Sequence, residues 1–161
     1  MAAAKGLETY LNDHLAGSAA GSELASKLSS EYAATPYGPF LAELAREIEQ
    51  DKVTLEGLMR RLEIQQNPIK QAAGWIGEKA SRLKLSETMT GNQDLKCLLE
   101  LETLSLGIEG KLSMWRALIE VSDSHAELAA TDLARLAKRA ESQRSTLEDH
   151  RLQVAKGALT S

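Results

Sequence analysis

Cysteine, proline and aromatic residues are all scarce in this sequence of 161 residues. Its one cysteine, Cys97, excludes an intrachain disulfide framework and is typical of a reducing compartment. The three prolines stand at positions 36, 39 and 68, so no proline interrupts a helix after Pro68. Aromatic residues make up 4% of the chain, and helix-favouring Ala, Leu, Glu, Lys and Arg are common. This composition favours helices over strands.

Long apolar runs and strong charge are missing too. No apolar run reaches 18 residues, which excludes a membrane-spanning helix of the usual length. Residues 1–5 lack the apolar segment of a signal peptide. The net charge of −4 does not favour a nucleic-acid partner. Phosphate-binding loops, nucleophile elbows and CxxC pairs are absent, which weakens most enzyme classes. We therefore expect a cytoplasmic protein for which membrane binding is not favoured.

The chain contains five segments in which apolar residues recur at the intervals of a helix. The length predicts one domain over residues 1–161, large enough to bury about 70% of its unfolded surface. Pro36 and Pro39 end the first segment, and Asn67 with Pro68 is a good start for the third. The predicted helices, from the spacing of apolar residues, cover 7–33, 40–62, 68–85, 94–121 and 125–158.

The lengths of the connections predict the topology. Four of these helices are 23 residues or longer, which gives roughly 35 to 50 Å each. The joints at 35–39 and at 122–124 are short, whereas the connection over 63–93 is long and contains the helix 68–85. Long helices with short joints pack as antiparallel neighbours in a bundle. The long middle connection lets the chain cross the bundle once, between the second and third bundle helices.

Parts of the sequence resemble a known superfamily. The stretch 11–18, LNDHLAGS, resembles the first helix of ferritin-like proteins, and the helix over 40–62 is similar to the second of that pair. The last two helices also look like this superfamily, especially its small bacterial stress-associated members. The resemblance implies a ferritin-like four-helix bundle with its long, helix-containing crossover. Proteins of this kind carry a di-iron site made by one Glu from each of two helices and a Glu-x-x-His pair from each of the other two.

The ligand positions that the resemblance implies hold other residues. They fall at or near Ser18, Ile48-x-x-Asp51 (or Glu47-x-x-Gln50), Ser105 and Glu141-x-x-Arg144. No Glu-x-x-His occurs anywhere in the chain. Arg144 cannot lose its proton, so it repels a metal cation. The resemblance therefore implies that the di-metal site has been lost.

The same positions predict a polar layer inside the bundle. It would consist of His14, Ser18, Asp51, Ser105 and Arg144. Asp51 lies on the apolar stripe of its helix, so its carboxylate needs a partner. A buried ion pair with Arg144 is the favoured interpretation, and a residual metal contact is the other. His14 is read as a satisfied core histidine rather than a displaced ligand. The two serines are read as small residues that let helices approach closely.

Other chemistry-bearing residues have plain interpretations. Cys97 is expected to be a small buried side chain rather than a redox thiol. Glu102 and Glu109 flank the stripe of their helix and are expected on the surface, and the cluster 148–150 is read as a solvated face. The helix over 68–85 carries Trp75 among basic residues. It is expected to pack on the bundle, although a membrane surface or a partner groove would also suit it.

Three functions stay open from the sequence alone. The favoured one is a non-catalytic bacterial ferritin-like binding or assembly module, linked to stress response and without a cofactor. The second is an oxidoreductase or metal-storage protein whose rearranged site uses His14, Asp51 and Glu102 to hold iron or manganese. The third is a peripheral membrane or partner-binding protein that acts through the helix 68–85. Ferritin-like proteins often pair through helix faces, so the resemblance also implies a homodimer. The sequence does not specify a protein partner.

Overall fold

The computed structural model describes residues 4–67 and 91–160, and its regular elements in these ranges are all helical. The long helices are α1 (Lys5–Glu31), α2 (Gly38–Arg61), α4 (Gln93–Glu120) and α6 (Leu133–Ala158). A single 3-10 turn, η1 (Ser122–Ser124), and a one-turn helix, α5 (Ala126–Ala129), connect α4 to α6. The prediction of an all-α protein is confirmed for this part of the chain.

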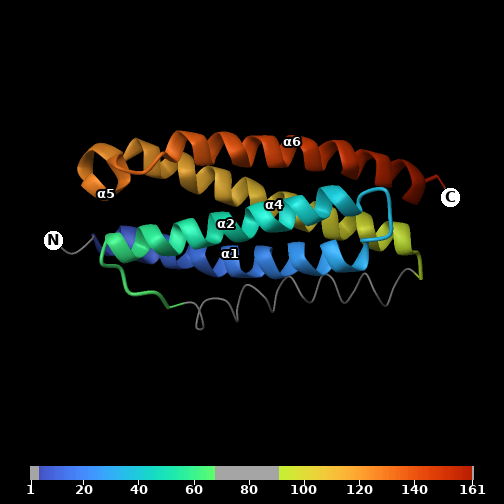
Figure 1. Ribbon diagram of the computed structural model, residues 1–161, viewed down its shortest axis with the longest axis horizontal. Coiled ribbons are helices and arrows are strands. Elements are labelled where there is room, and N and C mark those ends of the chain that lie inside the picture. Colours follow the sequence, from blue (N-terminus) through green and yellow to red (C-terminus); the bar gives the residue numbers. More distant parts are fainter. Residues whose placement is uncertain (1–3, 68–90, 161) are drawn as a thin grey trace.

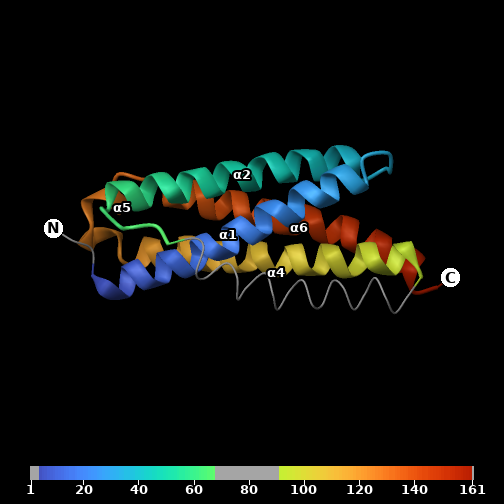
Figure 2. The ribbon, with the colours of Figure 1, turned by 90° about the horizontal axis from the view of Figure 1, so that it is seen from below.

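The four long helices lie side by side along one axis (Figure 1). α1 packs on α2, α4 packs on α6, and α1 also contacts α4. Figures 1 and 2 show α2 and α4 running in one direction, and α1 and α6 in the opposite one. α2 therefore ends at the opposite end of the bundle from the start of α4. This is the geometry expected where the chain must cross the bundle once between these two helices.

Leucine spacing explains which helix faces meet. The six apolar residues that define the stripe of α2 and its C-terminal cap are all buried: Leu41, Leu44, Ile48, Leu55, Leu58 and Leu62. The predicted stripe of α6 is buried as well, from Leu133 to Val154. In α4 the predicted stripe is wrong at two positions, because Ser105 is half-buried and Ile119 is exposed. Leu104 and Leu118 occupy the core in their place.

The helix ends agree with local capping chemistry. Asn92 caps α4, where its side chain accepts hydrogen bonds from the backbone N–H groups of Asp94 and Leu95. The predicted bounds of α1, α2 and α4 are within two residues of the observed ones. The prediction of one helix over 125–158 is wrong, because the chain breaks at residues 130–132. Asp132 starts a new helix there by accepting a bond from the backbone N–H of Arg135 at 3.1 Å.

The joint between α1 and α2 depends on a glycine. A Cβ at Gly38 would lie 2.3 Å from the backbone oxygen of Ala33, closer than any side chain tolerates. Gly38 therefore lets α2 begin directly against the end of α1 (Figure 2). The predicted helix over 68–85, with Pro68 at its start and Trp75 among its basic residues, lies outside the described residues.

Candidate functional site: a buried polar layer beside an apolar pocket

One carboxylate is buried in the middle of the bundle. Asp51 on α2 is 2% exposed. Its Oδ2 accepts a hydrogen bond from Lys111 Nζ at 2.6 Å, and its Oδ1 accepts one from Arg139 Nε at 3.1 Å. Gln143 Nε2 also donates to Oδ2, at 3.3 Å. Two cations and one amide, from α4 and α6, therefore hold this carboxylate.

Further hydrogen bonds connect these groups to one another. Gln143 Oε1 accepts from Lys111 Nζ at 2.5 Å, and Gln143 Nε2 donates to Glu47 Oε2 at 2.8 Å. We call the set Glu47, Asp51, Lys111, Arg139 and Gln143 the polar layer. A buried polar group is costly when it is left without a partner, and each member of this layer has at least one. The layer therefore links α2, α4 and α6 at the centre of the bundle.

The electrostatics of the layer follow from burial. The side chain of Lys111 is 10% exposed. Burial lowers the pKa of Lys111, while the nearby Asp51 carboxylate opposes this by favouring the charged amine. Asp51 and its two cationic partners therefore form a structural ion pair in a poorly solvated core. Both oxygens of its carboxylate already accept hydrogen bonds, so neither is left for a ligand.

The predicted partner of Asp51 is wrong. Arg144 has a side chain that is 51% exposed, and it pairs with Glu109 on the surface. The reason is helical geometry. Gln143 continues the spacing of buried residues from Ala140 to Leu147, and the next residue is rotated by about 100° away from that face. Arg139 and Lys111 reach Asp51 instead.

The three remaining residues that the sequence predicted to join Asp51 also lie outside the observed polar layer. Ser18, Ser105 and His14 are half-buried, and none of them bonds to Asp51. Ser18 and His14 lie instead on the wall of the pocket described below. The structure therefore brings only Asp51, of the five predicted residues, into the layer.

The three residues of the alternative metal site, His14, Asp51 and Glu102, do not lie together either. Glu102 pairs with Arg151 at 3.0 Å, and Asp51 is held by Lys111 and Arg139. Among residues 4–67 and 91–160, no group of three His, Cys, Asp or Glu side chains has the geometry to hold a metal ion. The two cations beside Asp51 would repel a metal cation there. The residues of this layer thus do not fit the di-iron group that the resemblance implies.

The surface predictions hold for the glutamates but not for the histidine. The side chains of Glu102 and Glu109 are each 44% exposed. His150 is half-buried, and its ring stacks on Phe40 with a centroid distance of 4.2 Å. Its position one turn after Leu147 turns it toward α2, so the cluster 148–150 is only partly solvated.

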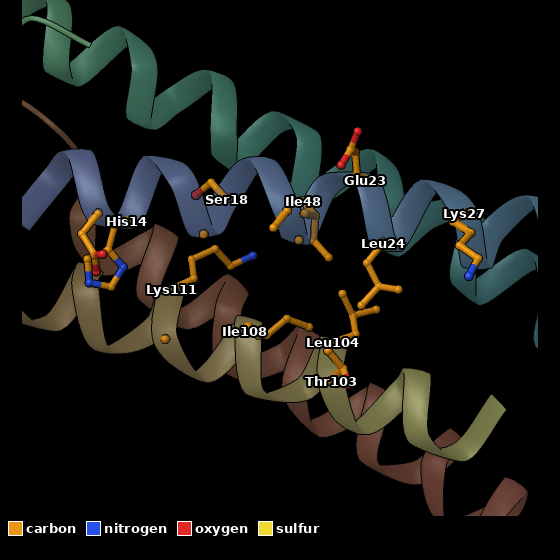
Figure 3. Close-up of a pocket in the computed structure, with 16 residues that line it drawn as sticks. His14, Ser18, Glu23, Leu24, Lys27, Ile48, Thr103, Leu104, Ile108 and Lys111 are labelled. Atoms are coloured by element: carbon orange, nitrogen blue, oxygen red, sulfur yellow. The ribbon is translucent and has the colours of Figure 1, made fainter. Parts of the chain in front are cut away.

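A pocket of about 440 Å³ lies between α1 and α4. Its apolar lining includes Leu24, Ile48, Leu104 and Ile108. Figure 3 shows Leu24 pointing from α1 toward Leu104 on α4, and the Lys111 side chain running between the two helices. The pocket and the polar layer therefore share Lys111.

Glycines make the room for this pocket. Gly17 and Gly21 on α1 and Gly107 and Gly110 on α4 all line it. A Cβ placed on Gly21, Gly107 or Gly110 would meet no atom of residues 4–67 and 91–160 within 4 Å. These three glycines therefore do not bring α1 and α4 into contact. A glycine in a helix interior costs about 1 kcal/mol relative to alanine, so this stretch is not optimised for helix stability.

Two polar groups stand at one end of the pocket. Figure 3 shows His14 reaching from α1 toward α4, with Ser18 one turn further along α1. The His14 ring contacts the Tyr10 ring with a centroid distance of 4.6 Å. Burial lowers the pKa of the His14 imidazole below its ordinary value, so the ring is neutral at pH 7. Within the described part of the chain, neither the His14 ring nitrogens nor the Ser18 hydroxyl has a hydrogen-bond partner. His14 is predicted from the sequence to be a core histidine with hydrogen-bonded nitrogens, and the described residues supply no such partner.

No family model, curated protein or solved structure matches this chain. None of the helices in the described ranges is long and apolar enough to cross a membrane.

A second polar cluster surrounds Cys97 near the start of α4. Glu100 is fully buried, and its Oε2 accepts a hydrogen bond from the Tyr32 hydroxyl at 2.9 Å. Lys27 donates to Oε1 of the same carboxylate at 3.2 Å. Burial, more than its hydrogen bond to Glu100, raises the pKa of Tyr32 above its ordinary value. The cluster ties the end of α1 to α4.

The thiol of Cys97 should react slowly. Cys97 is 3% exposed, and burial raises its pKa to about 11. Only the thiolate is nucleophilic, so we expect Cys97 in the native protein to react with a disulfide reagent such as DTNB at pH 8 at least about 100-fold more slowly than in urea. Equal rates in the native and unfolded protein would contradict the buried placement.

The sequence analysis missed two buried polar residues, Gln143 and Glu100, and two half-buried cations, Lys111 and Arg139. Gln143 carried a usable signal, because it lies on the apolar stripe of α6 just as Asp51 lies on that of α2. Lys111 and Arg139 stand beside buried stripe residues, and their long side chains reach inward from there. Glu100 likewise follows Cys97 by one helical turn, next to the buried Leu101.

Proposed function

We propose that this chain is a ferritin-like bundle without a working di-metal site, which serves as a non-catalytic binding or assembly module. The observation that carries this proposal is the ion pairing of Asp51. The only residue near a former ligand position that remains a buried carboxylate is held by Lys111 and Arg139, where a metal would need negative ligands. The direction of the four long helices, with α2 parallel to α4, supports the ferritin-like arrangement.

The remaining parts of the proposal rest on the resemblance. A bacterial, cytoplasmic protein linked to stress response and assembled as a homodimer is what the resemblance implies. An iron- or manganese-dependent oxidoreductase or storage protein is the weaker candidate, because His14, Asp51 and Glu102 each have separate surroundings. The open pocket between α1 and α4 favours binding over catalysis, since its lining is mostly apolar.

Metal analysis tests the proposal directly. The full chain, purified without a chelator and then dialysed against iron(II) or manganese(II), should retain less than about 0.1 metal ion per chain by mass spectrometry of the elements. A stoichiometry near two ions per chain would overturn it. The Glu109→Ala variant serves as the control for surface binding, because Glu109 lies outside the polar layer. If metal did bind and Asp51→Asn abolished it, the oxidoreductase or storage function would replace this proposal.

A further inference from the structure

The pocket between α1 and α4 has features that neither the fold nor the polar layer requires. Its volume of about 440 Å³ lies within the range of about 300–1,000 Å³ that is common for small-molecule sites. Its walls are largely apolar, and within the part of the chain that the structure describes, glycines on both facing helices leave open space where side chains would otherwise stand. A bundle that only needed to be stable would fill this space.

The polar groups of the pocket specify the kind of ligand. His14 and Ser18 offer hydrogen bonds at one end that no side chain or backbone group in the described ranges takes up. The two lysines that line the pocket are engaged by carboxylates, Lys27 by Glu100 and Lys111 by Asp51. Asp13 and Glu23 on the α1 side add negative charge to the lining. This distribution disfavours an anion and favours a neutral molecule with one polar end.

We propose that the α1–α4 pocket binds a neutral, mostly apolar small molecule whose single hydroxyl or carbonyl group bonds to His14 and Ser18. Its aliphatic or aromatic body lies against Leu24, Leu104 and Ile108, over the glycines. The inference rests on the proposed binding role and names the ligand class for it. The pocket has the form that such ligands need, with apolar walls and a few convergent polar groups.

A neutral fluorescent probe tests the pocket. The full chain should bind N-phenyl-1-naphthylamine saturably, with a blue-shifted and enhanced emission. Gly107→Leu places a side chain in the open space and should weaken binding at least about 10-fold, with the helical circular dichroism unchanged. Gly6→Leu is the matched control, because a Cβ at Gly6 would also meet none of the described residues within 4 Å, and Gly6 lies outside the pocket. It should bind the probe as the wild type does.

A pair of competitors tests the polar end. 1-Naphthol should displace the probe more effectively than 1-methylnaphthalene, which has the same ring and no hydroxyl. His14→Phe keeps a ring against Tyr10, and it should weaken 1-naphthol about 2- to 10-fold while leaving 1-methylnaphthalene unchanged. Equal losses for both competitors would overturn the role of His14.

Two results would overturn the inference: no saturable probe binding, and equal binding by wild type and Gly107→Leu. If the wild type binds no probe and Gly107→Leu also loses stability, another protein surface, from this chain or a second copy, fills the pocket. Metal content measured on the same samples separates the two proposals, since bound metal counts against the proposed function and absent probe binding counts against this ligand class.

Discussion

Replacing Asp51 by alanine will lower the free energy of unfolding by about 3–5 kcal/mol. The reason is the pair of cations that remains. Lys111 is 10% exposed and Arg139 is 22% exposed, so neither can move fully into water when the carboxylate is removed. Urea unfolding followed by circular dichroism at pH 7 measures the loss.

The control for this prediction is a surface pair. Glu109→Ala breaks the pairing with Arg144, in which both side chains are about half exposed, and should cost less than about 1 kcal/mol. An Asp51→Ala loss as small as that of the control would show that Lys111 and Arg139 are better solvated than the structure has them.

Removing the charges together should behave differently. A triple variant with Asp51→Leu, Lys111→Met and Arg139→Met removes the ion pairs of Asp51 and leaves the half-buried Glu47, bonded to Gln143, as the one charge of the layer. We expect it to recover most of the stability lost in Asp51→Ala, because replacing a whole buried ion cluster by apolar groups is often neutral or stabilising. Recovery would establish that the cost lies in the stranded cations, and a further loss would show that the charged layer itself stabilises the bundle.

Replacing Trp115 by alanine will cost a similar amount, about 3–5 kcal/mol. Trp115 is fully buried, and among residues 4–67 and 91–160 it is the largest fully buried side chain. Its removal leaves a cavity between packed helices that cannot collapse completely. The same urea titration measures this loss.

The variant Trp115→Phe separates the effect of lost side-chain volume from that of the indole N–H group. The Trp115 Nε1 group is buried without a hydrogen-bond partner in the described structure, so phenylalanine removes an unsatisfied donor together with part of the volume. We expect Trp115→Phe to cost less than half as much as Trp115→Ala. Equal costs would indicate that the indole ring contributes through a contact that phenylalanine cannot make.

The sequence predicts this fold well where burial follows one simple period. The stripe of α2 needs only leucine and isoleucine at intervals of three, four and seven, and all of its members are buried. The break before α6 has no such signal. Asp132 stands among good helix formers, and only its hydrogen bond to the backbone of Arg135 shows that the helix starts again there.

The site is harder to predict than the fold for two physical reasons. The partners of Asp51 stand beside the stripes rather than on them, and the flexibility of Lys111 and Arg139 decides where their charges lie. The pocket depends on missing side chains. Gly21 and Gly107 share one cavity only because α1 packs beside α4, and no period within either helix reveals that pairing.

Lys111 connects the buried ion pairs of the polar layer with the pocket between α1 and α4. Its side chain lines the pocket, while its amine is bound to Asp51 and Gln143. An occupant that fixes the stem of Lys111 also fixes the geometry of those bonds, and a change in those bonds alters the wall that the occupant meets. Such coupling is reciprocal. Loss of Asp51 should therefore weaken probe binding, and a bound ligand should offset part of the instability of the Asp51→Ala variant.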